Sequence, residues 1–368
     1  MWQRALNYPH LWILLAAWFT TLVQLPLLIR LAHRIGAVDR PRGYKGHAIP
    51  TPFLGGVAIF IAFTVAILTT LRLPDLRPFH SLMDFVVRGE LHRLFGIVIG
   101  AFFILLLGLL DDFRPINAFV KLLVLLFIAL FLHRIGLSVT LFPPAWDGVN
   151  VAISVLWMAG VTSAMNSLDH MDGNCAGAAA VSAFFCFAYA WDRLNPQPWL
   201  SYASVAVLGG CLGFLQFNFK PAQIFLGNSG AFLLGFLLAA LTLLGGWGSR
   251  EEPLKAVLVP MLLVGVPLYD ITLATLLRYK NRVVGNLYEA IVYCGRDHLS
   301  HRLVALGLSE RAAVIFQYVL GCLFGMIALS AKWMPMQAFL YGVGLLGAFL
   351  VGLAMVLDRA KLPPAGKT

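Results

Sequence analysis

Long apolar runs dominate the chain, and short polar segments separate them. A helix that crosses a bilayer needs roughly 20 predominantly apolar residues. By this criterion we expect eleven membrane-spanning helices: Leu11–Ile29, Thr51–Leu71, Leu94–Leu110, Ala118–Leu132, Val149–Met165, Cys175–Trp191, Leu200–Phe217, Ser229–Trp247, Ala256–Leu277, Ala312–Ala331 and Met334–Leu357. Ten spans are the alternative, because Ala118–Leu132 is short and carries Lys121. The runs do not alternate between apolar and polar residues, which disfavours a β-barrel.

The composition supports the same fold class. Hydrophobic residues make up 60% of the 368 residues and charged residues only 12%, which excludes a soluble enzyme, a coiled coil and a disordered protein. We therefore expect an all-α, polytopic integral-membrane helical bundle, with residues 1–368 forming one domain. The first apolar run has no clear cleavage site, so we interpret it as a span and not a signal peptide. Five cysteines without a CxxC pattern indicate neither a disulfide framework nor a zinc site.

Basic residues predict the orientation. Loops on alternate sides of the predicted spans divide so that one side, with the helix ends beside it, holds 17 of the 27 Lys and Arg residues. By the positive-inside rule that side is cytoplasmic, and the N-terminus lies outside. We expect a multi-pass protein of the cell (inner) membrane. The net charge of +10 is interpreted as basic loops beside anionic membrane lipid, with no nucleic acid as a partner.

The polar chemistry falls on the same predicted side. Asp111 and Asp112 follow an apolar run directly, and two adjacent carboxylates at a helix end require a cation or a basic side chain, which Lys121 could supply. A Mg²⁺ site or a general base is the functional interpretation, and a plain stop to the helix is the alternative. The loop Asn166–Asn174 holds two carboxylates, two amides and an imidazole around Gly173. It is interpreted as a cation or catalytic loop, with an ordinary polar turn as the alternative.

Three further segments carry candidate residues. The turn Gly227-Asn228-Ser229-Gly230 opens a predicted span and favours a helix cap over a phosphate site. The loop from Arg278 to Arg311 is basic and contains Asp297-His298-x-x-His301-Arg302, which suits a diphosphate. Asp270 lies inside a predicted span, where a carboxylate is costly, and structural pairing and substrate contact are equally favoured. The basic segment Asp39–Gly56, through which the chain returns to the bilayer, contains Lys45 and His47 as candidate phosphate contacts.

Together these segments resemble the polyprenyl-phosphate N-acetylhexosamine-1-phosphate transferase family. The matching motifs, in chain order, are Asp39-x-Pro41…Lys45-x-His47-x-x-Pro50-x-Pro52-x-x-Gly55-Gly56, Leu110-Asp111-Asp112 with Lys121, Asn166-x-x-Asp169-x-x-Asp172-Gly173, Gly213-Phe214-Leu215-x-Phe217-Asn218-x-x-Pro221-Ala222-x-Ile224-Phe225-x-Gly227, Pro267-x-x-Asp270 and Asp297-His298-x-x-His301-Arg302-Leu303. They run along nearly the whole chain.

The resemblance implies a reaction and a set of roles. A UDP-N-acetylhexosamine gives its sugar-1-phosphate to undecaprenyl phosphate in the membrane lipid, UMP is released, and lipid-linked cell-envelope glycan synthesis begins. Mg²⁺ is the implied cofactor, and Mn²⁺ could replace it. The implied catalytic residues are Asp111, Asp112, Asp169, Asp172, His298 and His301. The implied substrate-binding residues are Lys45, His47, Lys121, Asn218, Asp270 and Arg302. The implied metal-facing residues are Asn166, Asn228 and Asp172.

Three positions depart from the family pattern. Asn228 stands where the family usually has a metal-binding aspartate, so the affinity for Mg²⁺ should fall unless Asp169 or Asp172 compensates. Ser300 stands where the histidine motif usually has a further histidine. His170 stands where the central loop usually has a glycine. The cluster also lacks the longer histidine run of the muramoyl-pentapeptide branch, which disfavours that substrate.

Two other function classes remain as alternatives. One is a non-catalytic relative that binds polyprenyl phosphate or nucleotide sugar, and position 228 is the feature that separates it from an active transferase. The other is a transporter, which an inverted repeat and charges near the middle of the membrane would support. The sequence leaves open the choice of hexosamine and whether the chain forms a homodimer.

Overall fold

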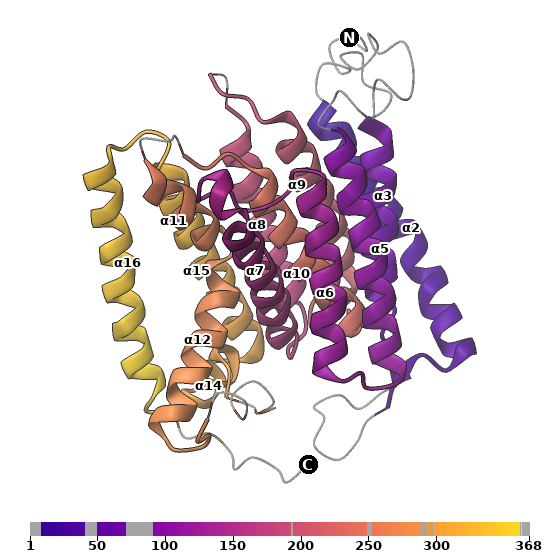
Figure 1. The fold of residues 1–368 in the computed structure, drawn as a ribbon. Helices are drawn as coiled ribbons and strands as arrows, with labels where there is room; N and C mark the ends of the chain where they lie inside the picture. Colours follow the sequence, from indigo (N-terminus) through magenta and orange to yellow (C-terminus); the bar gives the residue numbers. More distant parts are fainter. Residues whose placement is uncertain are drawn as a thin grey trace, which may run out of the picture.

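The computed structural model describes residues 9–40, 50–70, 91–192, 194–248, 252–286, 289, 293, 295, 297–360 and 362. Its helices (Figure 1) are α2 (Pro9–Ile35), α3 (Gly55–Thr70), α5 (Leu91–Phe113), α6 (Ala118–Arg134), α7 (Asp147–Leu168), α8 (Asn174–Ala190), α9 (Pro198–Asn218), α10 (Gly227–Leu244), α11 (Pro253–Leu263), α12 (Gly265–Lys280), α14 (Leu299–Ala305), α15 (Glu310–Ser330) and α16 (Met336–Leu357), with a 3-10 turn at Pro144–Trp146. A two-residue antiparallel pair joins β1 (Val38–Asp39) to β2 (Thr51–Pro52).

The all-α, multi-pass membrane fold is confirmed. Within the described ranges, seven helices are long and apolar enough to cross a membrane, or eight when the bent pair α11 and α12 counts as one span. The shorter helices α3 and α8 are also apolar, and a helix lies over every predicted span. The total of eleven spans stays a prediction.

The predicted span Ala256–Leu277 differs from a single straight helix. It consists of α11 and α12, which meet at Val264 with a bend of 80°. Pro260 lies inside α11 and Pro267 lies in the first turn of α12. Proline has no N–H donor and its ring crowds the preceding turn, so two prolines seven positions apart interrupt the helix between them.

Helix α10 lies at the centre of the bundle. Most of its residues from Ser229 to Thr242 are buried, and it packs against α5 and α7. Small residues allow the close approach: a Cβ atom at Gly108 of α5 would lie 2.3 Å from the Cα atom of Ser229, and one at Gly56 of α3 would lie 2.5 Å from the backbone nitrogen of Gly230. This packing brings the first turn of α10 against the end of α5.

Helix α16 lies at the periphery. Only Phe339, Leu346 and Leu357 are buried among its residues, whereas Leu345, Val351 and Met355 are exposed. An apolar face without protein partners in the described part of the chain is expected of a helix that contacts lipid. The chain is therefore a multi-pass membrane protein whose central helices position the polar residues described next.

Candidate active site

The polar residues predicted from the sequence meet at one end of the bundle. Helices α5, α7 and α12 end there, α10 begins there, and α14 lies beside them, at the lower end of the view in Figure 1. Each helix enters or leaves the apolar region at this end, so side chains far apart in sequence become neighbours. For the predicted residues that the structure describes, the expectation that they share one end of the bundle is confirmed.

Asp111 is buried and both of its oxygens are paired. Its Oδ2 atom lies 2.7 Å from Nζ of Lys121 in α6. Its Oδ1 atom accepts a 2.7 Å hydrogen bond from the backbone N–H of Ile116, in the loop between α5 and α6. Lys121 therefore supplies the counter-charge expected from the sequence, and Asp111 fixes the turn between the two helices.

The neighbouring Asp112 faces α10. Its two oxygens accept hydrogen bonds from the backbone N–H groups of Asn228, at 2.7 Å, and Ser229, at 3.1 Å. Gly227 has a φ of +70°, and a Cβ atom there would lie 2.7 Å from Oδ2 of Asp112, so glycine is required for this approach. The turn does begin α10, but its N-cap residue, Leu226, makes no side-chain cap. The carboxylate of Asp112, from α5, accepts from the first N–H groups of the helix instead.

The central loop is held in place by the segment between α9 and α10. Asn218 accepts a hydrogen bond from Gly173 N–H at 3.0 Å and donates one to the carbonyl of Ile224 at 2.8 Å. Asp172 accepts a 3.1 Å hydrogen bond from the backbone N–H of Ala222. Gly173 has a φ of +78°, which confirms the expected tight turn. Asn218 is buried and uses its amide to join the two loops.

Asp169 is the carboxylate without a protein donor. Within the described residues its side chain accepts no hydrogen bond. Burial, followed by the negative charges of Asp112 and Asp172, raises the pKa of Asp169 to about 7. The side-chain amides of Asn166 and Asn228 also make no hydrogen bond in the described part of the chain. Crowded carboxylates beside unused amide oxygens fit a hard divalent cation. The described residues contain no group of three His, Cys, Asp or Glu side chains at metal-binding distances. A cation site here would therefore use amide oxygens as well as carboxylates.

A cluster of imidazoles adjoins this loop. The ring of His170 lies 5.0 Å from that of His298 and 4.6 Å from that of His301, between ring centroids. His298 makes a 2.7 Å contact through Nδ1 to Asp270, whose other oxygen accepts a 2.6 Å hydrogen bond from Leu299 N–H. Burial and then the charge of His298 lower the pKa of His170 to about 3, so its ring is neutral. Asp270 is fully buried, and of the two roles left open the structure favours pairing.

Two arginines fix the start of α14. Arg278 donates two hydrogen bonds, of 2.6 and 2.7 Å, to the carboxylate of Asp297. Burial alone would raise the pKa of Asp297, but the guanidinium of Arg278 outweighs it and holds that pKa below its usual value. Arg302 is buried and donates to the carbonyls of Asp297 and Leu357. Arg302 thus supports the imidazole cluster through backbone contacts.

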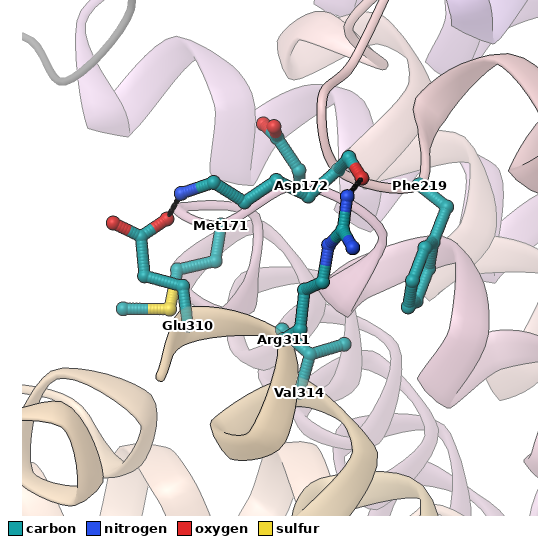
Figure 2. Close-up of a pocket in the computed structure, with 7 residues that line it drawn as sticks. Met171, Asp172, Phe219, Glu310, Arg311 and Val314 are labelled. Atoms are coloured by element: carbon teal, nitrogen blue, oxygen red, sulfur yellow. Dashed lines mark hydrogen bonds and ion pairs between the residues drawn. The ribbon is translucent and has the colours of Figure 1, made fainter. Parts of the chain in front are cut away.

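A shallow pocket lies beside the central loop. Met171, Asp172, Phe219, Lys220, Glu310, Arg311 and Val314 line it (Figure 2). Lys220 pairs with Glu310, and Arg311 donates a 2.7 Å hydrogen bond to the carbonyl of Lys220. These contacts attach the start of α15 to the segment that holds Asp172.

The site therefore has two parts. The acidic group is formed by Asp111, Asp112, Asp169 and Asp172, and the imidazole group by His170, His298 and His301. The loop that carries both Asp169 and His170 joins them. The predicted Lys45 and His47 lie outside the described residues. The sequence interpretation counted the imidazole of His170 among the polar groups of the central loop, but gave it no role of its own. It noted Ser300 only as a departure from the family pattern, and did not predict its contact with His170.

Comparisons with known proteins identify relatives of the whole chain. The profile of the family described as Glycosyl transferase family 4 matches residues 94–246. The chain is 31% identical to the probable undecaprenyl-phosphate N-acetylglucosaminyl 1-phosphate transferase of Bacillus subtilis, over 95% of this chain and 92% of that protein.

Two further relatives carry different names. The decaprenyl-phosphate N-acetylglucosaminephosphotransferase of Mycolicibacterium smegmatis is 31% identical over 89% of this chain and 84% of its own length. The phospho-N-acetylmuramoyl-pentapeptide-transferase of Oceanobacillus iheyensis is 27% identical over 85% of this chain and 95% of its own length. With this similarity over almost its full length, the chain belongs to the polyprenyl-phosphate N-acetylhexosamine-1-phosphate transferase family.

Proposed function

We propose that this protein transfers N-acetylhexosamine-1-phosphate from a UDP-sugar to undecaprenyl or another polyprenyl phosphate, at the cytoplasmic face of the cell membrane. In the net change, a bond forms between an oxygen of the lipid phosphate and the sugar-linked phosphorus, the bond from that phosphorus to the UMP oxygen breaks, and UMP leaves. The observation that carries the proposal is the meeting of an acidic and an imidazole cluster at one end of an apolar bundle. There, a phosphate on a lipid tail and a soluble nucleotide sugar are both within reach.

The acidic group is proposed to orient the lipid phosphate and to hold a cation. Asn166, Asp169, Asp172 and the side-chain oxygen of Asn228 would face Mg²⁺, which Mn²⁺ could replace. A divalent cation at this point supplies neutralisation of phosphate charge. Asp112, held by two backbone N–H groups of α10, is proposed to orient or deprotonate the lipid phosphate. The Asp111–Lys121 pair keeps the end of α5 in place.

The imidazole group is proposed to contact the donor. His298 and His301 are assigned to the diphosphate and sugar, because imidazole N–H groups donate to phosphate oxygens. Asp270 fixes the orientation of His298, and Arg302 and Asn218 hold α14 and the central loop. Lys45 and His47 remain candidates for phosphate contact on sequence grounds.

The test is a donor screen with purified protein in detergent, undecaprenyl phosphate and Mg²⁺. We expect UMP release with a UDP-N-acetylhexosamine, and UDP-GlcNAc is the first donor to try because of the names of the relatives. Release of UMP only when the lipid phosphate is present identifies transfer. Absence of UMP with every UDP-hexosamine, together with retained binding of UDP, would instead favour a non-catalytic relative.

A further inference from the structure

Two of the three departures from the family pattern touch each other. The side chain of His170, in the loop after α7, contacts the hydroxyl of Ser300 in α14 through Nε2, across 130 positions in the sequence. Sequence spacing gives no reason for these two positions to be related. Their contact in the folded chain supplies that reason.

The side chains of His170 and Ser300 share one space in the protein interior. Ser300 is fully buried, and the ring of His170 lies against it while also facing the rings of His298 and His301. A larger ring at position 300 would need the space that His170 now occupies. Conversely, glycine at position 170 would leave that space empty. Close packing therefore admits one imidazole, from either position.

The hydrogen bonds fix the ring. The Nδ1 atom of His170 lies 2.8 Å from the carbonyl of Ser167. Because a carbonyl only accepts, Nδ1 donates to it, and Nε2 faces the Ser300 hydroxyl. Both nitrogens of His170 are thereby used within the protein, so the ring acts on its neighbours through its position.

We propose that His170 is a positioning residue for the transferase reaction, and that His170 and Ser300 form a matched pair. The pair places one imidazole against both His298 and His301, and it joins the loop of Asp169 and Asp172 to α14. The inference rests on the proposed function. The inference adds that donor recognition depends on an imidazole at position 170, in the central loop. In the family pattern that imidazole is at position 300, in α14.

The test is a double-mutant cycle with His170→Gly, Ser300→His and the two changes together. We expect each single change to lower kcat/KM for UDP-GlcNAc by at least about tenfold, and the double variant to return to within about threefold of the original protein, as coupled contact residues do. The KM for undecaprenyl phosphate should stay constant throughout. A purely structural defect would lower activity toward both substrates in proportion to the loss of folded protein.

The matched control is His10→Gly. His10 also bonds a serine, Ser201, at 2.9 Å and contacts the aromatic rings of Phe187 and Tyr202, but it lies at the other end of the bundle (Figure 1). We expect unchanged kinetics for this variant. Losses that simply add in the double variant, or full activity of His170→Gly alone, would overturn the matched pair while the proposed function stands.

The affinity for UDP, measured by calorimetry, separates the two hypotheses. If the original protein binds UDP but releases no UMP, the proposed function fails, and the same cycle measured on UDP binding still decides on the pair. Coupled losses in binding support it, and additive losses refute it. If the original protein neither binds UDP nor releases UMP, both fail together.

Discussion

Adjacent carboxylates in this protein have opposite environments. Asp111 is neutralised by Lys121, whereas Asp112 accepts hydrogen bonds from uncharged groups at the start of α10, the backbone N–H groups of Asn228 and Ser229, and lies near the charge of Asp169. These environments suit a stabilising role for Asp111 and the reactive role proposed for Asp112. Their substitutions should therefore separate stability from activity.

Asp112→Asn should lower turnover by at least about a hundredfold, the usual lower range for loss of an acid–base group, with little change in the melting temperature in detergent. Asp111→Asn should instead lower the free energy of unfolding by about 1–3 kcal/mol, because it leaves Lys121 without its charged partner. UMP release and thermal unfolding measure the two effects. Asp147→Asn, at the opposite end of the bundle, is the control for turnover, which it should leave unchanged, because Asp147 contacts only the site-remote His133 among the described residues. Near-normal turnover of Asp112→Asn would remove this residue from the mechanism.

Asn228→Asp should strengthen the binding of a divalent cation, because a carboxylate replaces a neutral amide oxygen beside Asp112 and Asp169. The measurement is a Mn²⁺ titration followed by electron paramagnetic resonance, with the Mg²⁺ dependence of UMP release beside it. Asn195→Asp, in the loop between α8 and α9, is the matched control. An unchanged titration would mean that the cation, if bound, gets its ligands elsewhere.

At the residue scale, the sequence predicted which side chains meet and, for Asp111, its partner Lys121, but not the other contacts. Successive loops lie on alternate sides of the predicted spans, and this alternation placed Asp112, Asp172 and His301 on the same side. The partner of Asp112 is a backbone turn 116 positions away, and backbone donors leave no signal in side-chain identity. The same reason hid the roles of Asn218 and Arg302.

Among the helices, the position of the site depends on close packing between α5, α3 and α10. The apolar runs predicted where the helices lie, because lipid requires continuous backbone hydrogen bonding over about 20 residues. They did not predict the bend between α11 and α12, since Pro260 and Pro267 fall inside an otherwise apolar run. Nor did they predict which glycines form contacts, because glycine alone does not indicate a neighbour.

Gly108→Ala should lower the melting temperature and reduce UMP release. The added Cβ atom would lie 2.3 Å from the Cα atom of Ser229. Because that neighbour is a backbone atom, the two helices would have to move apart. Overpacking of this kind typically lowers the free energy of unfolding by about 1–3 kcal/mol. Gly344→Ala in α16 is the matched control, because nothing lies within 4 Å of its Cβ position. Equal melting temperatures for the two variants would show that the crossing tolerates the extra carbon.

For the whole molecule, the orientation in the membrane remains a prediction from the distribution of Lys and Arg. The loop after α8 contains Leu194, which is 88% exposed, and the residue after α14 is the exposed Leu306. These two positions lie at opposite ends of the bundle, because α8 runs away from the end that carries Asp172. Labelling from one side of the membrane can therefore distinguish them.

In a background where Cys294 and Cys322 are replaced by serine, Leu194→Cys should react with a membrane-impermeant maleimide in intact cells. Leu306→Cys should react only after the cells are lysed. The remaining cysteines, Cys175, Cys186 and Cys211, are buried. The reverse pattern would put the acidic and imidazole groups outside the cell and contradict the use of a cytoplasmic nucleotide sugar.

Helix α16, at the edge of the bundle, contacts the site through its last turn. The carbonyl of Leu357 accepts a hydrogen bond from Arg302, and Asp358 pairs with Lys280, although most of α16 has few protein neighbours. A fluorescent reporter fused directly after residue 357 would remove the second contact and disturb the first. One fused after residue 360 keeps both. The choice of fusion point will therefore decide whether a tagged version of this enzyme reports its natural kinetics.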